Sequence, residues 1–167
     1  RILGRPASRL LAMNLVKKAG FLRRISDWAG VRTLYCSHVS WSLRRIARLQ
    51  AGTEQKQADY LARYCLLAAA SGAFDRVYWG PLIGQREGLV DDGTSEFPDT
   101  PHVAFYGKAL GRVAAYRKRP AFHAFRAVRA ALEGATLRAS LADGPGLFAL
   151  DFETGGQTLH CVWTRDG

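Results

Sequence analysis

Residues 33–42, TLYCSHVSWS, place a histidine and a tryptophan at the end of a run of strand-forming residues. A histidine there can be a catalytic acid or base, can replace another catalytic group, or can be an ordinary hydrogen-bonded side chain. The neighbouring tryptophan supplies a flat aromatic face. His38 and Trp41 are therefore the first candidates for a functional site.

Several familiar catalytic schemes do not fit this stretch. A hydrolase triad needs a G-x-S-x-G turn, which the chain lacks. Cys36 and His38 would face the same side of a strand, but if that strand lined a closed barrel, Cys36 would lie too deep inside the barrel for a substrate to reach. His102, His123 and His160 stand on different elements without metal-ligand spacing. The sequence therefore predicts no metal site and no cofactor.

A second aromatic strand end lies further along the chain. Residues 75–80 read DRVYWG, so Tyr78 and Trp79 come at the end of this strand. A long loop rich in glycine and proline follows at 81–101, and loops of that length are usually functional or disordered. The loop carries three charged candidates, Arg86, Glu87 and Asp91. Its carboxylates can be catalytic, but they can also be solvated or paired with an arginine.

The elements that would position these residues alternate between helix and strand. Apolar spacing and terminal proline or glycine residues predict helices at 6–29, 53–71 and 119–133. β-Branched and aromatic residues predict strands at 31–39 and 75–80. This order favours an α/β fold with two parallel strands joined by a right-handed crossover.

The pattern changes after Gly134. Three strand-sized runs follow at 135–143, 146–154 and 157–164, and they are separated by DGPG and TGG turns. These runs predict a small antiparallel β-meander. We therefore expect one domain at 1–134 and the start of an antiparallel β-domain at 135–167.

This order resembles the C-terminal end of a (β/α)8 glycoside hydrolase of the retaining clan. Ser37-His38-Val39-Ser40-Trp41 is similar to the Thr-Glu-x-Asn/Gly-Trp pattern at the end of the seventh barrel strand. Residues 54–82 are similar to the next helix and the aromatic eighth strand, and 119–128, RPAFHAFRAV, resembles the last barrel helix. The resemblance covers roughly residues 10–135.

The resemblance implies the C-terminal portion of a (β/α)8 (TIM) barrel followed by the β-meander. Barrel active sites lie at the carboxyl ends of the strands, so His38, Trp41 and Trp79 would face one mouth. The implied ligand is an oligo- or polysaccharide, such as a bacterial envelope glycan. The implied sugar-binding residues are Trp41, Tyr78, Trp79, Arg86 and Asp91.

The departure from the family concerns its catalytic carboxylates. Retaining glycosidases use two, and the acid/base of the clan lies on the fourth strand, before residue 1. His38 stands at the nucleophile position and cannot form the usual glycosyl ester. Three alternatives follow. The barrel binds glycan without hydrolysis or with other chemistry, Glu87 or a nearby acid substitutes, or His38 is an ordinary strand-end residue in another register.

The net charge of +10 comes from the first third of the chain. Residues 1–50 hold nine arginines and two lysines against one acidic residue, Asp27, whereas basic and acidic residues balance in 51–167. This excess fits a solvated helix face. The alternative function is a non-catalytic domain that binds an anionic polymer, either an acidic polysaccharide or nucleic acid, through residues 1–50. No nucleic-acid-binding motif accompanies the charge, which disfavours nucleic acid.

The remaining composition is that of a globular protein. Apolar residues make up 48% of the chain, and no run is long enough to cross a membrane. The basic N-terminal stretch lacks a clean cleavage site, so it does not read as a signal peptide. Cys36, Cys65 and Cys161 form no C-x-x-C pair. Free thiols favour a reducing compartment such as the cytoplasm.

Overall fold

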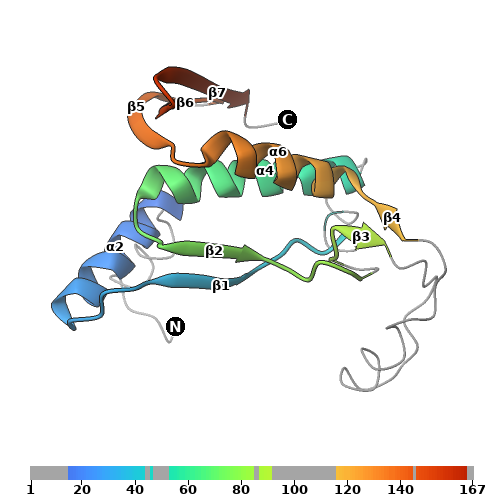
Figure 1. Cartoon of the computed structure of the whole chain (residues 1–167), viewed down its shortest axis with the longest axis horizontal. Helices are drawn as coiled ribbons and strands as arrows, with labels where there is room; N and C mark the ends of the chain where they lie inside the picture. Colours follow the sequence, from blue (N-terminus) through green and yellow to red (C-terminus); the bar gives the residue numbers. More distant parts are fainter. Residues whose placement is uncertain are drawn as a thin grey trace, which may run out of the picture. The chain divides into compact units, whose positions relative to one another are not determined.

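The computed structural model describes residues 15–43, 46, 53–84, 87–91, 116–144 and 146–164. This part is a mixed α/β structure, as predicted (Figure 1). Its named elements, in chain order, are α2 (Leu15–Trp28), β1 (Tyr35–Val39), α4 (Thr53–Ser71), β2 (Arg76–Trp79), β3 (Val90–Asp91), β4 (Arg117–Lys118), α6 (Pro120–Leu132), β5 (Thr136–Gly144), β6 (Leu147–Thr154) and β7 (Gln157–Thr164).

Strands β1 and β2 form a two-stranded sheet. Asp75 N donates to Leu34 O at 2.9 Å, and Gly80 N donates to Val39 O at 3.1 Å. Donors and acceptors advance in the same direction along the two strands, so the pair is parallel. Helix α4 connects them, which confirms the predicted β-α-β order. No helix of the described residues has the length and apolar character needed to cross a membrane.

The chain divides into two compact units. The first unit comprises Arg1–Ser37, Arg63–Tyr78 and Val128–Gly167. The second unit comprises His38–Ala62 and Trp79–Ala127. The division passes through α4 and α6, so each unit takes part of both helices.

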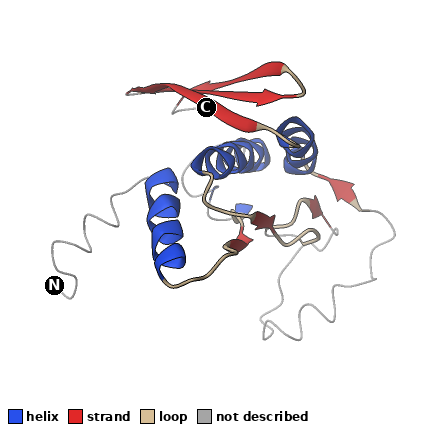
Figure 2. Ribbon diagram, turned by 60° about the vertical axis from the view of Figure 1, so that its left-hand side comes forward, coloured by secondary structure: helices blue, strands red, loops and turns tan. Residues whose placement is uncertain are grey.

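The first unit contains the predicted β-meander. Strands β5, β6 and β7 form one three-stranded antiparallel sheet in that order, and Figure 2 draws its strands in red. Leu150 and Phe152 on β6 are buried, and their neighbours Asp151 and Glu153 lie on the other face. The β6–β7 turn is Gly155-Gly156, with φ values of 55° and 77°. Positive φ at both positions suits a type I′ turn, which fits the twist of the strands.

Helix α2 is tied to the start of the parallel strands by Arg23. Its Nε donates to Ala73 O at 2.8 Å, and a terminal nitrogen lies 2.7 Å from Asp75 Oδ2. Leu34 N donates to the same oxygen at 2.7 Å. The Leu34 N–H and the Arg23 guanidinium together hold the pKa of Asp75 below its usual range. The first turns of the predicted helix, 6–14, lie outside the described residues.

The core of the second unit combines apolar and polar side chains. Ile46, Leu61, Leu89 and Ala121 are all at most 2% exposed, and so are two polar residues, Gln57 and Arg119. A short antiparallel pair, β3 with β4, joins the loop after β2 to the start of α6. Burying a polar group costs free energy unless the group is hydrogen-bonded. The hydrogen bonds of Gln57 and Arg119 therefore identify the backbone segments that this unit holds in fixed positions.

Candidate functional site

Three aromatic side chains of the second unit form a cluster, which we call the aromatic cluster: Trp41, Tyr60 and Trp79. The Trp41 and Trp79 rings are stacked, with centroids 6.1 Å apart and an interplanar angle of 18°. The Trp41 and Tyr60 centroids are 5.3 Å apart. Trp41 follows β1 and Trp79 ends β2, so the cluster lies at the carboxyl ends of the parallel strands. Trp79 is 9% exposed, whereas Trp41 is only half-buried.

Glu87 is held beside the end of β1. Ser40 Oγ donates a hydrogen bond to Glu87 Oε2 at 2.9 Å. The buried side chain of Gln57 joins the same two segments, because its Nε2 donates to Trp41 O at 2.9 Å and to Glu87 O at 3.1 Å. The backbone of Trp41 and the backbone of Glu87 are therefore fixed to one amide. This arrangement places a carboxylate and an aromatic ring at one strand end.

A second group, which we call the charge cluster, consists of Glu54, Asp91, Arg117 and Arg119. Arg117 donates to both oxygens of Glu54, at 2.9 and 2.6 Å, and to Asp91 Oδ2 at 2.9 Å. Arg119 lies 3.3 Å from each of the same two carboxylates. The hydrogen bonds from Arg117 lower the pKa of Glu54 despite its partial burial. Asp91, expected from the sequence to bind sugar, is therefore engaged by two arginines.

The other predicted site residues take separate places. His38 is exposed on β1. Tyr78 precedes Trp79 on β2 and therefore points to the opposite face. It is 46% exposed and belongs to the first unit, where its ring meets Tyr35 edge-on at 6.4 Å. Arg86 lies outside the described residues. The structure thus brings together Trp41, Trp79 and Glu87.

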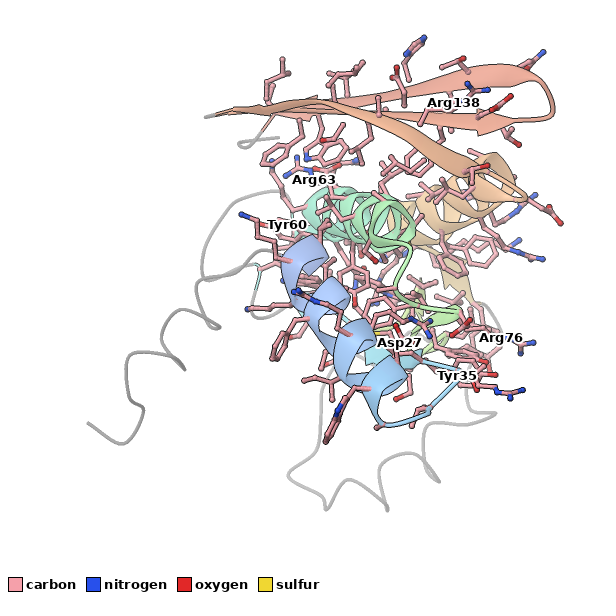
Figure 3. All side chains as sticks on the ribbon, turned by 90° about the vertical axis from the view of Figure 1, so that its left-hand side faces the viewer. Asp27, Tyr35, Tyr60, Arg63, Arg76 and Arg138 are labelled. Atoms are coloured by element: carbon pink, nitrogen blue, oxygen red, sulfur yellow. The ribbon has the colours of Figure 1, made fainter. Side chains whose placement is uncertain are left out.

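Tyr35 has a second neighbour on the exposed face of the parallel strands. The guanidinium carbon of Arg76 lies 5.9 Å from the Tyr35 ring centroid, and the two side chains lie next to each other in Figure 3. Such a contact is a cation–π interaction. The exposed face of β1 and β2 in the first unit is therefore aromatic and basic.

Sequence reasoning did not identify Ser40, Gln57, Tyr60 or Arg119 as parts of a site. Tyr60 and Gln57 lie three residues apart on α4, which is a helical neighbour spacing, but that spacing alone does not say what they contact. Arg119 pairs with Glu54, which is distant in the sequence, and no local pattern reveals such a pair. Gln57 falls within residues 54–82, which the sequence reasoning singled out, but no signal there marked it as a buried contact.

The described residues line a cavity but offer no candidate metal site. Among those residues, no group of three or more His, Cys, Asp and Glu side chains is arranged to hold a metal ion. An apolar cavity of about 310 Å³ lies in the first unit and contains none of the predicted site residues. Its walls include Leu67, Phe148 and Trp163.

Comparison with known proteins adds no assignment to this geometry. No protein-family model matches the chain, and neither a curated protein nor a solved structure is significantly similar to it. The aromatic cluster and the residues around Glu87 are therefore the features from which a function can be inferred.

Proposed function

We propose that this chain is part of a glycoside hydrolase-like protein and binds an oligo- or polysaccharide at the aromatic cluster. The observation that carries the proposal is the stacked pair Trp41–Trp79 at the carboxyl ends of β1 and β2, with Glu87 beside it. Aromatic faces suit the apolar faces of sugar rings, and a few convergent polar groups then fix orientation. The half-buried Trp41 ring is the surface that a sugar would contact.

The polar groups around Trp41 support a hydroxyl-bearing ligand. Glu87 is acceptor-only when ionised, so it can take hydrogen bonds from sugar hydroxyls in addition to the one from Ser40. His38 is exposed at the end of the same strand and can donate or accept. A carboxylate and an imidazole at one strand end can orient a sugar ring that stacks on Trp41.

The parallel pair itself supports a larger sheet. A two-stranded sheet is marginal without further strands, and parallel strands are usually covered on both faces. Tyr35 and Tyr78 are 50% and 46% exposed on β1 and β2. We propose that further strands extend this sheet into the (β/α)8 barrel that the sequence resembles. In such a barrel, sites lie at the carboxyl ends of strands, which is where Trp41 and Trp79 stand.

The carboxylates of the described residues favour binding over hydrolysis. Retaining hydrolysis needs two carboxyl groups about 5–5.5 Å apart. Glu87 accepts a hydrogen bond from a serine, but Asp91 is engaged by Arg117 and Arg119. The position of the family's nucleophile is held by His38. We therefore propose that this part of the protein recognises the glycan. Observed cleavage would add a hydrolytic activity to this function.

Calorimetric titration with neutral, N-acetylated and uronic acid oligosaccharides tests the proposal. Trp41→Ala is expected to weaken binding about tenfold or more, because it removes the stacking face. Trp28→Ala is the matched control, since Trp28 is a tryptophan of the first unit and is 89% exposed on α2. Equal losses in the two variants, or no binding by the wild type, would contradict the proposal.

Two further measurements, the salt dependence of binding and an assay of turnover, separate the alternative functions. Binding that falls steeply with salt and ignores sugar identity would instead support an anionic-polymer function for the basic residues of 1–50. In the described part of that segment, Arg23 is already committed to Asp75. Turnover of an activated aryl glycoside that disappears in Glu87→Gln would make the protein a hydrolase.

A further inference from the structure

Arg119 is the most completely buried charged residue of the described segments, with 1% of its surface exposed. Its guanidinium does more than neutralise Glu54 and Asp91. One terminal nitrogen donates to Gly84 O at 2.9 Å and to Gly88 O at 2.7 Å. A buried arginine that grips two backbone carbonyls fixes the backbone that carries them, because leaving either group without its partner would be expensive.

The two carbonyls belong to glycines whose backbones lie against each other. Gly88 N donates to Gly84 O at 3.1 Å, and Gly84 N donates to Val90 O at 3.0 Å. A Cβ atom on Gly88 would lie 2.3 Å from Gly84 N, so the two glycine backbones touch. Only glycine allows this approach. The backbones of Gly84 and Gly88 are therefore in contact, and the Arg119 guanidinium is hydrogen-bonded to both of them.

Glu87 is the residue immediately before Gly88. Its backbone carbonyl accepts from Gln57, and its carboxylate accepts from Ser40. We propose that Arg119 is a positioning residue for Glu87: by holding the carbonyls of Gly84 and Gly88, it sets where the Glu87 carboxylate meets a ligand at the end of β1. The role in ligand recognition rests on the proposed sugar site, whereas the positioning of Glu87 itself can be measured without sugar.

Arg117 provides the matched control for this inference. Like Arg119, it contacts the carboxylates of Glu54 and Asp91. Its side chain is 57% exposed. Among the described residues it makes no hydrogen bond to the glycine carbonyls. Arg117→Lys therefore perturbs the charge cluster without touching the loop. Arg119→Lys keeps the charge but replaces the planar fork that reaches the carbonyls and the carboxylates together.

The first measurement follows the Glu87 side-chain carboxyl carbon by NMR, assigned by its loss in Glu87→Gln. We expect this resonance to move in Arg119→Lys and to stay as in the wild type in Arg117→Lys. Gly88→Ala keeps Arg119 but displaces the loop, so it should move the same resonance. An unmoved Glu87 signal in Arg119→Lys or Gly88→Ala would overturn the inference, whatever the protein binds.

The second measurement is a double-mutant cycle on oligosaccharide affinity. Arg119→Lys should weaken binding about tenfold when Glu87 is present. It should change binding little in the Glu87→Gln background, because both substitutions remove the same contact between Glu87 and the ligand. Independent, multiplying losses would overturn positioning through Glu87. Absence of sugar binding by the wild type would refute the proposed function, and the NMR result would still decide the inference.

Discussion

Ser40 Oγ and Glu87 Oε2 lie 2.9 Å apart and join the end of β1 to the loop that follows β2. Gln57 ties the same two segments through their backbones. One hydrogen bond thus orients the carboxylate, and two others fix the chain that bears it. Parallel strands bring these segments to one edge, but the three polar contacts decide which atoms meet there.

Removing the serine hydroxyl should loosen the carboxylate more than it destabilises the fold. Ser40→Ala is expected to lower the free energy of unfolding by about 1 kcal/mol, because Glu87 is partly solvated and can bind water instead. Chemical denaturation monitored by tryptophan fluorescence measures this loss. Ser37→Ala, at an exposed position on β1, is the control and should leave the value unchanged.

The buried amide of Gln57 should matter more. Gln57→Leu leaves the carbonyls of Trp41 and Glu87 without their donor, and we expect a loss of about 1–3 kcal/mol in the free energy of unfolding. Gln55→Leu on the exposed face of the same helix should change it by less than about 0.5 kcal/mol. Similar losses in the two variants would show that the Gln57 contacts do not hold the strand end together.

The main elements could be predicted from the sequence because their signals are local. The predicted helix at 53–71 coincides with α4, and the helix predicted at 119–133 coincides with α6 to within a residue at each end. Alternation and glycine turns located β5, β6 and β7. Strand β1 begins at Tyr35, later than the predicted residue 31, because ladder pairing and not side-chain type sets where a strand starts.

The contacts of the site could be predicted only in part. Aromatic residues at two strand ends pointed to Trp41 and Trp79, whose rings are stacked in the structure, and their role in binding stays a prediction. Strands β3 and β4 are two residues long, so they carry no periodic signal, and their pairing joins Val90 to Lys118. The charge cluster that redirects Asp91 toward arginines depends on this non-local pairing. Contacts between residues so far apart in the sequence cannot be predicted from short sequence windows.

The charge cluster should make the protein sensitive to acid. The pKa of Glu54 is lowered in the folded chain, chiefly by the hydrogen bonds from Arg117. Its contribution is therefore complete above the ordinary glutamate pKa of about 4.3 and is lost as the pH falls through the lowered folded value. Unfolding curves between pH 7 and 3 should be flatter for Glu54→Gln than for the wild type. Exposed Glu133→Gln should keep the wild-type slope.

The thiol of Cys65 should react slowly in the folded protein. Burial raises its pKa to about 11, so at pH 8 its thiolate is about a hundredfold scarcer than that of an ordinary cysteine. Iodoacetamide labelling followed by mass spectrometry should therefore find Cys65 modified late, and rapidly once guanidinium unfolds the chain. Equal labelling rates of Cys65 before and after unfolding would contradict this environment.

The proposed sugar site is tested most directly by the four tryptophans of the chain, which are Trp28, Trp41, Trp79 and Trp163. Their indole N–H signals can be followed by NMR during titration with the oligosaccharide that binds best. The account predicts that the signals of Trp41 and Trp79 shift with saturation, while those of Trp28 and Trp163 stay in place. Shifts confined to Trp28 or Trp163, or no shift at any tryptophan at saturating sugar, would contradict it.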